Sequence, residues 1–160
     1  MYVPFDQLDD TARIWIYPSD TPFNESDLPS LEHQLETFVN GWVAHNNPLK
    51  ASFLIKYRRF IVLAVETEST QVSGCSIDSS VRFIQQIEAD FSKVLLDKMN
   101  VTFKQGEYFV HKSIPEFKAL VKNRSVTLDT IVFNNLVTTK SEFESHWEVT
   151  AQESWHQRYF

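Results

Sequence analysis

The chain has 160 residues, a length that lets one domain bury a large core without disulfide staples. Hydrophobic residues make up 42% of it and 13 are phenylalanine, which excludes a disordered chain. The net charge of −6, from 21 acidic and 15 basic residues, argues against nucleic acid and anionic membranes as partners. We therefore expect a single globular domain over residues 1–160.

Cysteine usage and the chain's start indicate a compartment. Cys75 is the only cysteine, so no internal disulfide can form, as is usual in a reducing cytosol. The first residues, MYVPFDQLDD, lack the basic and apolar parts of a signal peptide. No apolar run approaches the ~20 residues that a membrane span needs. These features predict a cytoplasmic protein without a membrane span.

The first half of the chain predicts a strand, a helix and a hairpin. Residues 13–17 (RIWIY) alternate as a strand does, and residues 28–44 have apolar side chains at helical spacing. Residues 50–57 and 60–66 predict a hairpin with Arg58 and Arg59 at its tip. The second arm is continuously apolar, which predicts a central strand covered on both faces.

The second half predicts one long helix and several short elements. Apolar spacing predicts a helix over residues 78–99, followed by short strands at 101–104, 108–110 and 130–133. Ser113-Ile114-Pro115-Glu116 has the sequence of a capping box that starts a further helix. Short helices and an aromatic end, SWHQRYF, complete the chain, and we expect this end to pack on the body.

The order β–α–β–β–α–β, followed by these short elements, predicts an α+β fold. We expect a mixed or antiparallel sheet with two main helices packed on one face, plus short C-terminal helices. A ferredoxin-like core is one instance of that arrangement.

The stretch between the second hairpin arm and the long helix is the candidate ligand site. It contains Gly74, Cys75, Ser76, Asp78, Ser79 and Ser80. We expect a strand-to-helix junction here, whose free backbone N–H groups could hold an anion together with the serine hydroxyls. Asp78 places a negative charge in the same stretch, and serines at a helix start also act as caps. Both interpretations remain open.

Cys75 admits two interpretations as well. A thiol near a helix N-terminus can be activated by the helix dipole, with His45 or His111 as its base. A small buried side chain behind a helix cap is the alternative.

Aromatic residues suggest further roles. Trp42 lies on the apolar stripe of its helix, which favours a place in the core. Trp155 and His156, in the polar aromatic tail, could close over the ligand site or over a second subunit.

Several reaction classes lack their motif. The glycines Gly41, Gly74 and Gly106 have no second glycine at P-loop spacing and no following Lys-Ser or Lys-Thr pair. The five histidines form no HExxH pair, and one cysteine cannot build a cysteine-rich zinc site, so no metal site is expected. The sequence identifies no cofactor.

Five strings carry a resemblance: MYVPFDQLDDTARIWIY, LKASF, SGCSIDSSV, DTIVFNNLV and ESWHQRYF. On these the chain resembles, over almost its whole length, a family of small soluble bacterial proteins often labelled "ABC transporter ATPase". The resemblance implies a single-domain cytoplasmic protein and brings no established activity. Because the Walker A loop is missing, we expect no ATP hydrolysis of the ABC type.

Together these observations predict a cytosolic domain that binds a small ligand or a protein partner near residues 74–80. A thiol-dependent enzyme or redox sensor that uses Cys75 is the alternative function. A homo-oligomer is also open.

Overall fold

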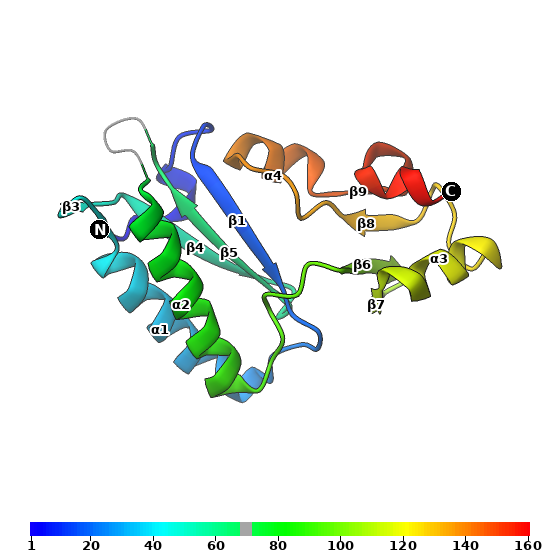
Figure 1. The fold of residues 1–160 in the computed structure, drawn as a ribbon, viewed down its shortest axis with the longest axis horizontal. Helices are drawn as coiled ribbons and strands as arrows, with labels where there is room; N and C mark the ends of the chain where they lie inside the picture. The colour runs from blue at the N-terminus through cyan, green and yellow to red at the C-terminus, as the bar shows by residue number, and fades with distance from the viewer. Residues whose placement is uncertain (68–71) are drawn as a thin grey trace. The chain divides into compact units, whose positions relative to one another are not determined.

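The computed structural model describes residues 1–67 and 72–160 (Figure 1). Within that part of the chain, helices combine with antiparallel sheets, so the predicted α+β class is confirmed. The chain forms two compact units, Met1–Leu96 with Thr138–Ser141, and Asp97–Val137 with Glu142–Phe160. That these two units act as one domain stays a prediction.

A three-stranded sheet forms the centre of the first unit. Its order is β1 (Arg13–Pro18), β5 (Phe60–Val65) and β4 (Ala51–Lys56), all antiparallel neighbours. All six residues of β5 are buried, as expected for a continuously apolar central strand. The predicted hairpin is therefore confirmed.

The tip of this hairpin lies one residue earlier than predicted. Tyr57 and Arg58 have φ of 55° and 56°, and the Arg59 N–H donates to the Lys56 carbonyl at 2.9 Å. These two left-handed residues turn the chain between the paired residues Lys56 and Phe60, and Arg59 completes the three-residue connection.

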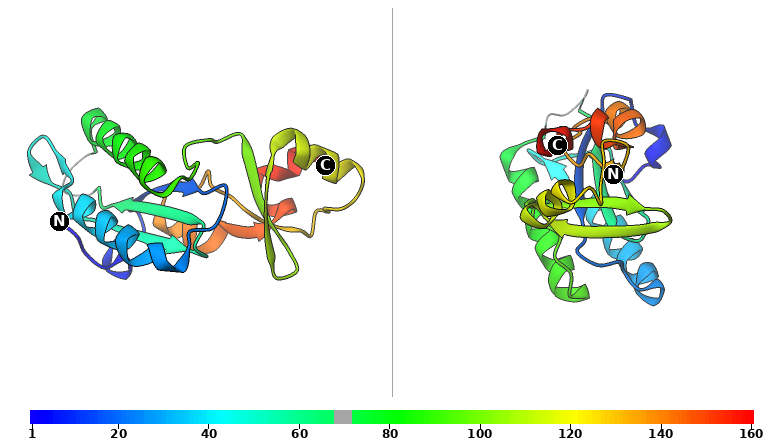
Figure 2. Two further views of the ribbon diagram at one scale, coloured as in Figure 1. Left: turned by 90° about the horizontal axis from the view of Figure 1, so that it is seen from below. Right: turned by 90° about the vertical axis from the view of Figure 1, so that its right-hand side faces the viewer.

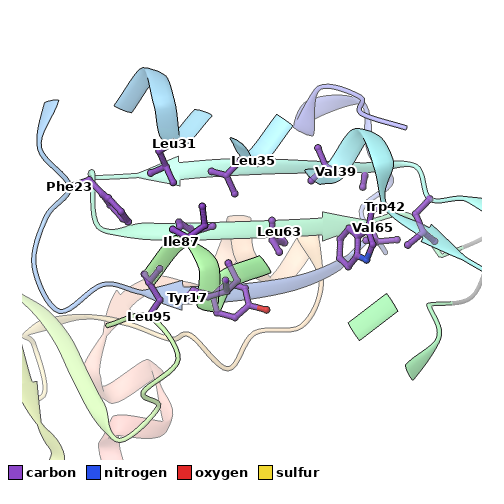
Figure 3. Packing of buried hydrophobic residues seen from close by; sticks show 14 of the residues in the cluster. Tyr17, Phe23, Leu31, Leu35, Val39, Trp42, Leu63, Val65, Ile87 and Leu95 are labelled. Atoms are coloured by element: carbon purple, nitrogen blue, oxygen red, sulfur yellow. The ribbon is translucent and has the colours of Figure 1, made fainter. Parts of the chain in front are cut away.

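Two helices, α1 (Leu28–Gly41) and α2 (Gly74–Phe91), cover one face of this sheet (Figure 1; Figure 2, left). Figure 3 shows Leu31, Leu35 and Val39 of α1 pointing toward Leu63 of β5, with Ile87 of α2 beside them. All five side chains are fully buried. The predicted packing of two helices on one face is thus confirmed.

The bounds of both helices differ from the prediction: α1 ends earlier, and α2 starts and ends earlier. α1 stops at Gly41 because Trp42 turns to extended backbone, with φ −74° and ψ 127°. Residues 43–48 then form a small hairpin of β2 (Val43–Ala44) and β3 (Asn47–Pro48). α2 begins at Gly74, before the predicted residue 78, and ends at Phe91, since Ser92 adopts φ 54°.

The complete ferredoxin-like sheet is a prediction that the structure contradicts. The first part of that fold is present: β5 lies between β1 and β4, and α1 connects β1 to β4 through β2 and β3. β6 (Asn100–Gln105), however, pairs in another sheet. The outer edge of β1 is instead covered by residues 138–140. The Ile14 N–H donates to the Thr138 carbonyl and the Lys140 N–H to the Ala12 carbonyl, both at 2.9 Å.

The second unit is built on a four-stranded antiparallel sheet. β7 (Tyr108–Ser113), β6, β8 (Ile131–Phe133) and β9 (Glu148–Thr150) follow one another in that order. Its hydrophobic cluster includes Phe103 and Phe117, both fully buried. The predicted strands are thus confirmed, with longer bounds for β6 and β7.

The short helices of the second unit are α3 (Ile114–Lys122), η3 (Ala151–Glu153) and η4 (Trp155–Tyr159). α4 (Lys140–His146) begins in residues of the first unit and ends in those of the second, and η1 (Phe5–Gln7) and η2 (Glu25–Asp27) belong to the first. The predicted capping box is present: the Glu116 N–H donates to Ser113 Oγ at 3.3 Å, and the Ser113 N–H donates to Glu116 Oε1 at 3.0 Å. Partly buried Trp155 and Tyr159 pack on the core of this unit, which confirms that the aromatic end docks.

Candidate functional site

A pocket of about 580 Å³ opens in the first unit, where the end of α1, the β2–β3 turn and the start of α2 meet. We call it the α1–α2 groove. Its lining includes Phe38, Gly41, Val43, His45, Cys75 and Ser79. The structure therefore brings together Cys75, Ser79 and His45, three residues that the sequence analysis placed in one candidate site.

The other predicted site residues do not line this groove. Ser76 and Ser80 are buried in the packed side of α2, and Gly74 and Asp78 are exposed beside the groove. The predicted order of strand, loop and helix is present, but its bounds differ, because β5 ends at Val65 and residues 74–80 already form the first two turns of α2.

Ser73, which the sequence analysis missed, is the cap of this helix. Its Oγ accepts the Ser76 N–H at 3.1 Å, the bond that an N-cap side chain makes with the third helical residue. A serine directly before the first helical residue is the usual signal for such a cap. The sequence analysis did not assign this cap to Ser73 because it expected the helix to start at residue 78.

The hydroxyl proton of Ser76 is already donated within the protein. Ser76 Oγ donates to the Val43 carbonyl at 2.7 Å. Ser76 Oγ and Ser73 Oγ are 2.8 Å apart, and since a hydroxyl has only one proton, Ser73 must be the donor of that bond. A chain of hydrogen bonds thus runs from Ser73 through Ser76 to the β2 backbone.

The remaining serines of α2 also donate to carbonyls. Ser79 Oγ donates to the Ser76 carbonyl at 2.8 Å, and Ser80 Oγ donates to the Ile77 carbonyl at 2.6 Å. All four serine protons are therefore engaged in internal bonds. The serine hydroxyls predicted to cradle an anion serve instead to cap the helix and to tie it to its neighbours.

Trp42 is part of the lining of the groove and is fixed there by buried contacts. Its exposed fraction is 2%, and its Nε1–H donates to the Ser76 carbonyl at 2.9 Å. The predicted core role of Trp42 is therefore confirmed. Its ring lies 5.0 Å from that of Phe38, which in turn stacks on Phe83 at 4.3 Å and 8°. These contacts fix the aromatic wall.

His45 lies at the tip of the β2–β3 hairpin, beyond the end of α1 at Gly41. His45 and Asn46 have φ of 50° and 65°, the two left-handed positions of a two-residue turn. Asparagine tolerates this region better than other non-glycine residues. The turn brings the exposed His45 and Asn46 side chains to the rim of the groove.

The described lining of the groove has little formal charge, with His45 as its one imidazole. No Asp, Glu, Lys or Arg is among those residues, although the chain contains 36 such side chains, 21 acidic and 15 basic. Cys75 is an exposed free thiol, so the alternative of a buried structural cysteine is wrong. Among the described residues no cluster of three or more His, Cys, Asp and Glu side chains could hold a metal ion.

Trp155 and His156 belong to the second unit, whereas the groove belongs to the first. Closure of this pair over the ligand site stays a prediction. His156 is fully buried, and its ring lies against Phe117 and Trp155. Its Nδ1 is 2.6 Å from Ser154 Oγ, while its Nε2 has no hydrogen-bond partner in the described part of the chain.

Burial determines the charge state of His156. Desolvation, with a smaller contribution from the nearby Arg158 cation, lowers the pKa of His156 to about 4. The imidazole is therefore neutral at pH 7, as its position in an aromatic core requires.

No protein-family model, curated protein or solved structure matches this chain. None of the described helices is long and apolar enough to cross a membrane.

We predict that acid destabilises the second unit through His156. The folded-state pKa of about 4 lies below the ordinary 6.5, so the unfolded state binds more protons between these values. Stability is full above pH 6.5 and falls by about 3 kcal/mol as the pH drops to 4. Urea unfolding at a series of pH values should show that the free energy of unfolding of His156→Asn no longer falls with pH in this way between pH 6.5 and 4.

The exposed His33 supplies the matched control, because His33→Asn should keep the wild-type slope. Equal slopes in the wild type and in His156→Asn would contradict a buried, neutral His156.

Proposed function

We propose that this protein is a binding module whose α1–α2 groove holds a small ligand. The observation that carries the proposal is the convergence of three elements on one pocket of about 580 Å³. That volume is within the range of small-molecule sites, which combine an apolar lining with a few polar groups. Phe38 and Val43 supply the apolar part, and His45, Asn46 and Cys75 supply the polar part.

Hydrogen bonds within the protein determine the shape of the groove, and these bonds are complete without a ligand. The Ser73–Ser76–Val43 chain and the Trp42–Ser76 bond tie its three walls together. A preformed site loses little conformational entropy when a ligand binds. This supports binding as the function. The bound group can be a free small molecule or a side chain that a protein partner inserts into the groove.

We place this binding in the cytosol, since an exposed, unpaired thiol such as Cys75 is compatible with a reducing compartment. Hydrolysis of ATP is not part of the proposal, because the described lining of the groove has no lysine and the sequence has no P-loop.

Gly41 allows the groove to be plugged without disturbing the fold. A Cβ built on Gly41 meets no atom within 4 Å, and its backbone is not left-handed. Gly41→Ala should therefore keep or raise stability, by up to about 1 kcal/mol. Gly41→Trp should place an indole in the groove and exclude a ligand.

We predict that at least one compound in a thermal-shift panel raises the unfolding midpoint of the wild type and of Gly41→Ala, but not of Gly41→Trp. The panel holds phosphates, nucleotides, carboxylates, divalent metals and neutral amides. A ligand at 100 times its Kd adds about 2.7 kcal/mol, which is a shift of about 5 °C or more. A flat panel, or shifts that persist in Gly41→Trp, would contradict a ligand site in the groove.

A thiol-dependent function is the second candidate, because Cys75 is exposed and shares the groove with His45. It predicts that native Cys75 reacts with iodoacetamide at pH 7 about tenfold or more faster than in the urea-unfolded chain. His45→Ala should remove this excess if His45 is the base. A native rate at or below the unfolded rate would rule out an activated thiol and leave binding as the function.

A further inference from the structure

We propose that the α1–α2 groove selects an uncharged, mainly apolar small molecule with one neutral hydrogen-bonding group, such as an amide. This rests on the proposed function and specifies the ligand class of the same site.

The charge of the lining is the first argument. The described lining contains no Lys or Arg to pair with a carboxylate or phosphate and no carboxylate to pair with an amine, and its one imidazole, that of His45, is exposed to water at the rim. The chain as a whole carries −6, so its long-range field also disfavours anions. Taking an unpaired charge out of water is costly, whereas a neutral molecule avoids this cost.

The available hydrogen-bonding groups are the second argument. The protons of Ser73 and Ser79, the two serines that line the groove, are donated to Ser76 Oγ and to the Ser76 carbonyl. Among the described residues, no hydrogen bond is recorded for the side chains of Thr37, His45 or Asn46 at the rim. Each of these can both donate and accept, which matches a neutral group that does the same.

The apolar surface is the third argument. Phe38 is partly exposed and held in place by Phe83 and Trp42, and Val43 is 44% exposed. Gly41 adds an open stretch with no side chain. A ligand with an apolar body can therefore remove this surface from water while its polar group reaches the rim.

Pairs of probes with the same shape and different charge test the inference. Saturation-transfer NMR would compare benzamide with benzoate and indole-3-acetamide with indole-3-acetate, and inorganic phosphate would be titrated separately. Each amide should bind at least tenfold tighter than its carboxylate. Its signal should survive in Gly41→Ala and vanish in Gly41→Trp.

A charge variant supplies the converse. Thr37 is exposed on α1 at the edge of the groove, so Thr37→Lys adds a cation there. It should reverse the preference, with the carboxylates binding tighter than the amides. Retention of the amide preference would contradict the view that missing charge sets selectivity.

The outcomes separate the two proposals. Plug-sensitive binding of benzoate or phosphate at least as tight as that of the amides would overturn the neutral class and leave the groove as a ligand site. Failure of both amides, while another compound gives a plug-sensitive thermal shift, would do the same. Amide signals that persist in Gly41→Trp would overturn both the class and the groove.

Discussion

The carbonyl and hydroxyl of Ser76 connect the three elements on which the candidate site depends. The carbonyl accepts the Trp42 indole N–H, and the hydroxyl donates to the Val43 backbone while it accepts the proton of Ser73. Each such bond contributes only about 1 kcal/mol, but together they fix where α2 begins and how the β2–β3 hairpin lies against it. The groove is the space that remains between these fixed parts.

The same bonds explain why the groove differs from an anion site. A helix start rich in serine suggests a cradle for phosphate, yet here the serine protons are donated to carbonyls of the protein. What faces the groove is apolar surface, with the side chains of Thr37, His45 and Asn46 at its rim. Selectivity for a neutral ligand follows from this arrangement of donors more than from the residue types.

Local patterns predicted what local physics determines. The apolar run of β5 and the capping box at Ser113 were both read correctly from the sequence. The choice of partner strands was not predicted: β6 pairs with β7 and β8 in another sheet, and residues 138–140 cover β1, because local patterns do not encode which strands pair. For the site, the sequence placed Cys75 and Ser79 in one stretch and offered His45 or His111 as a neighbour of Cys75, but it missed Ser73 and the turn that places His45.

The exchange rate of the Trp42 indole proton tests the central bond most directly. In a ¹H–¹⁵N NMR spectrum in D₂O, the account predicts that Trp42 Nε1–H is protected from exchange far more strongly than a free indole, since it is buried and donated to the Ser76 carbonyl. Exchange as fast as that of free tryptophan would mean that the end of α1 is not tied to α2. The groove would then lack its fixed wall.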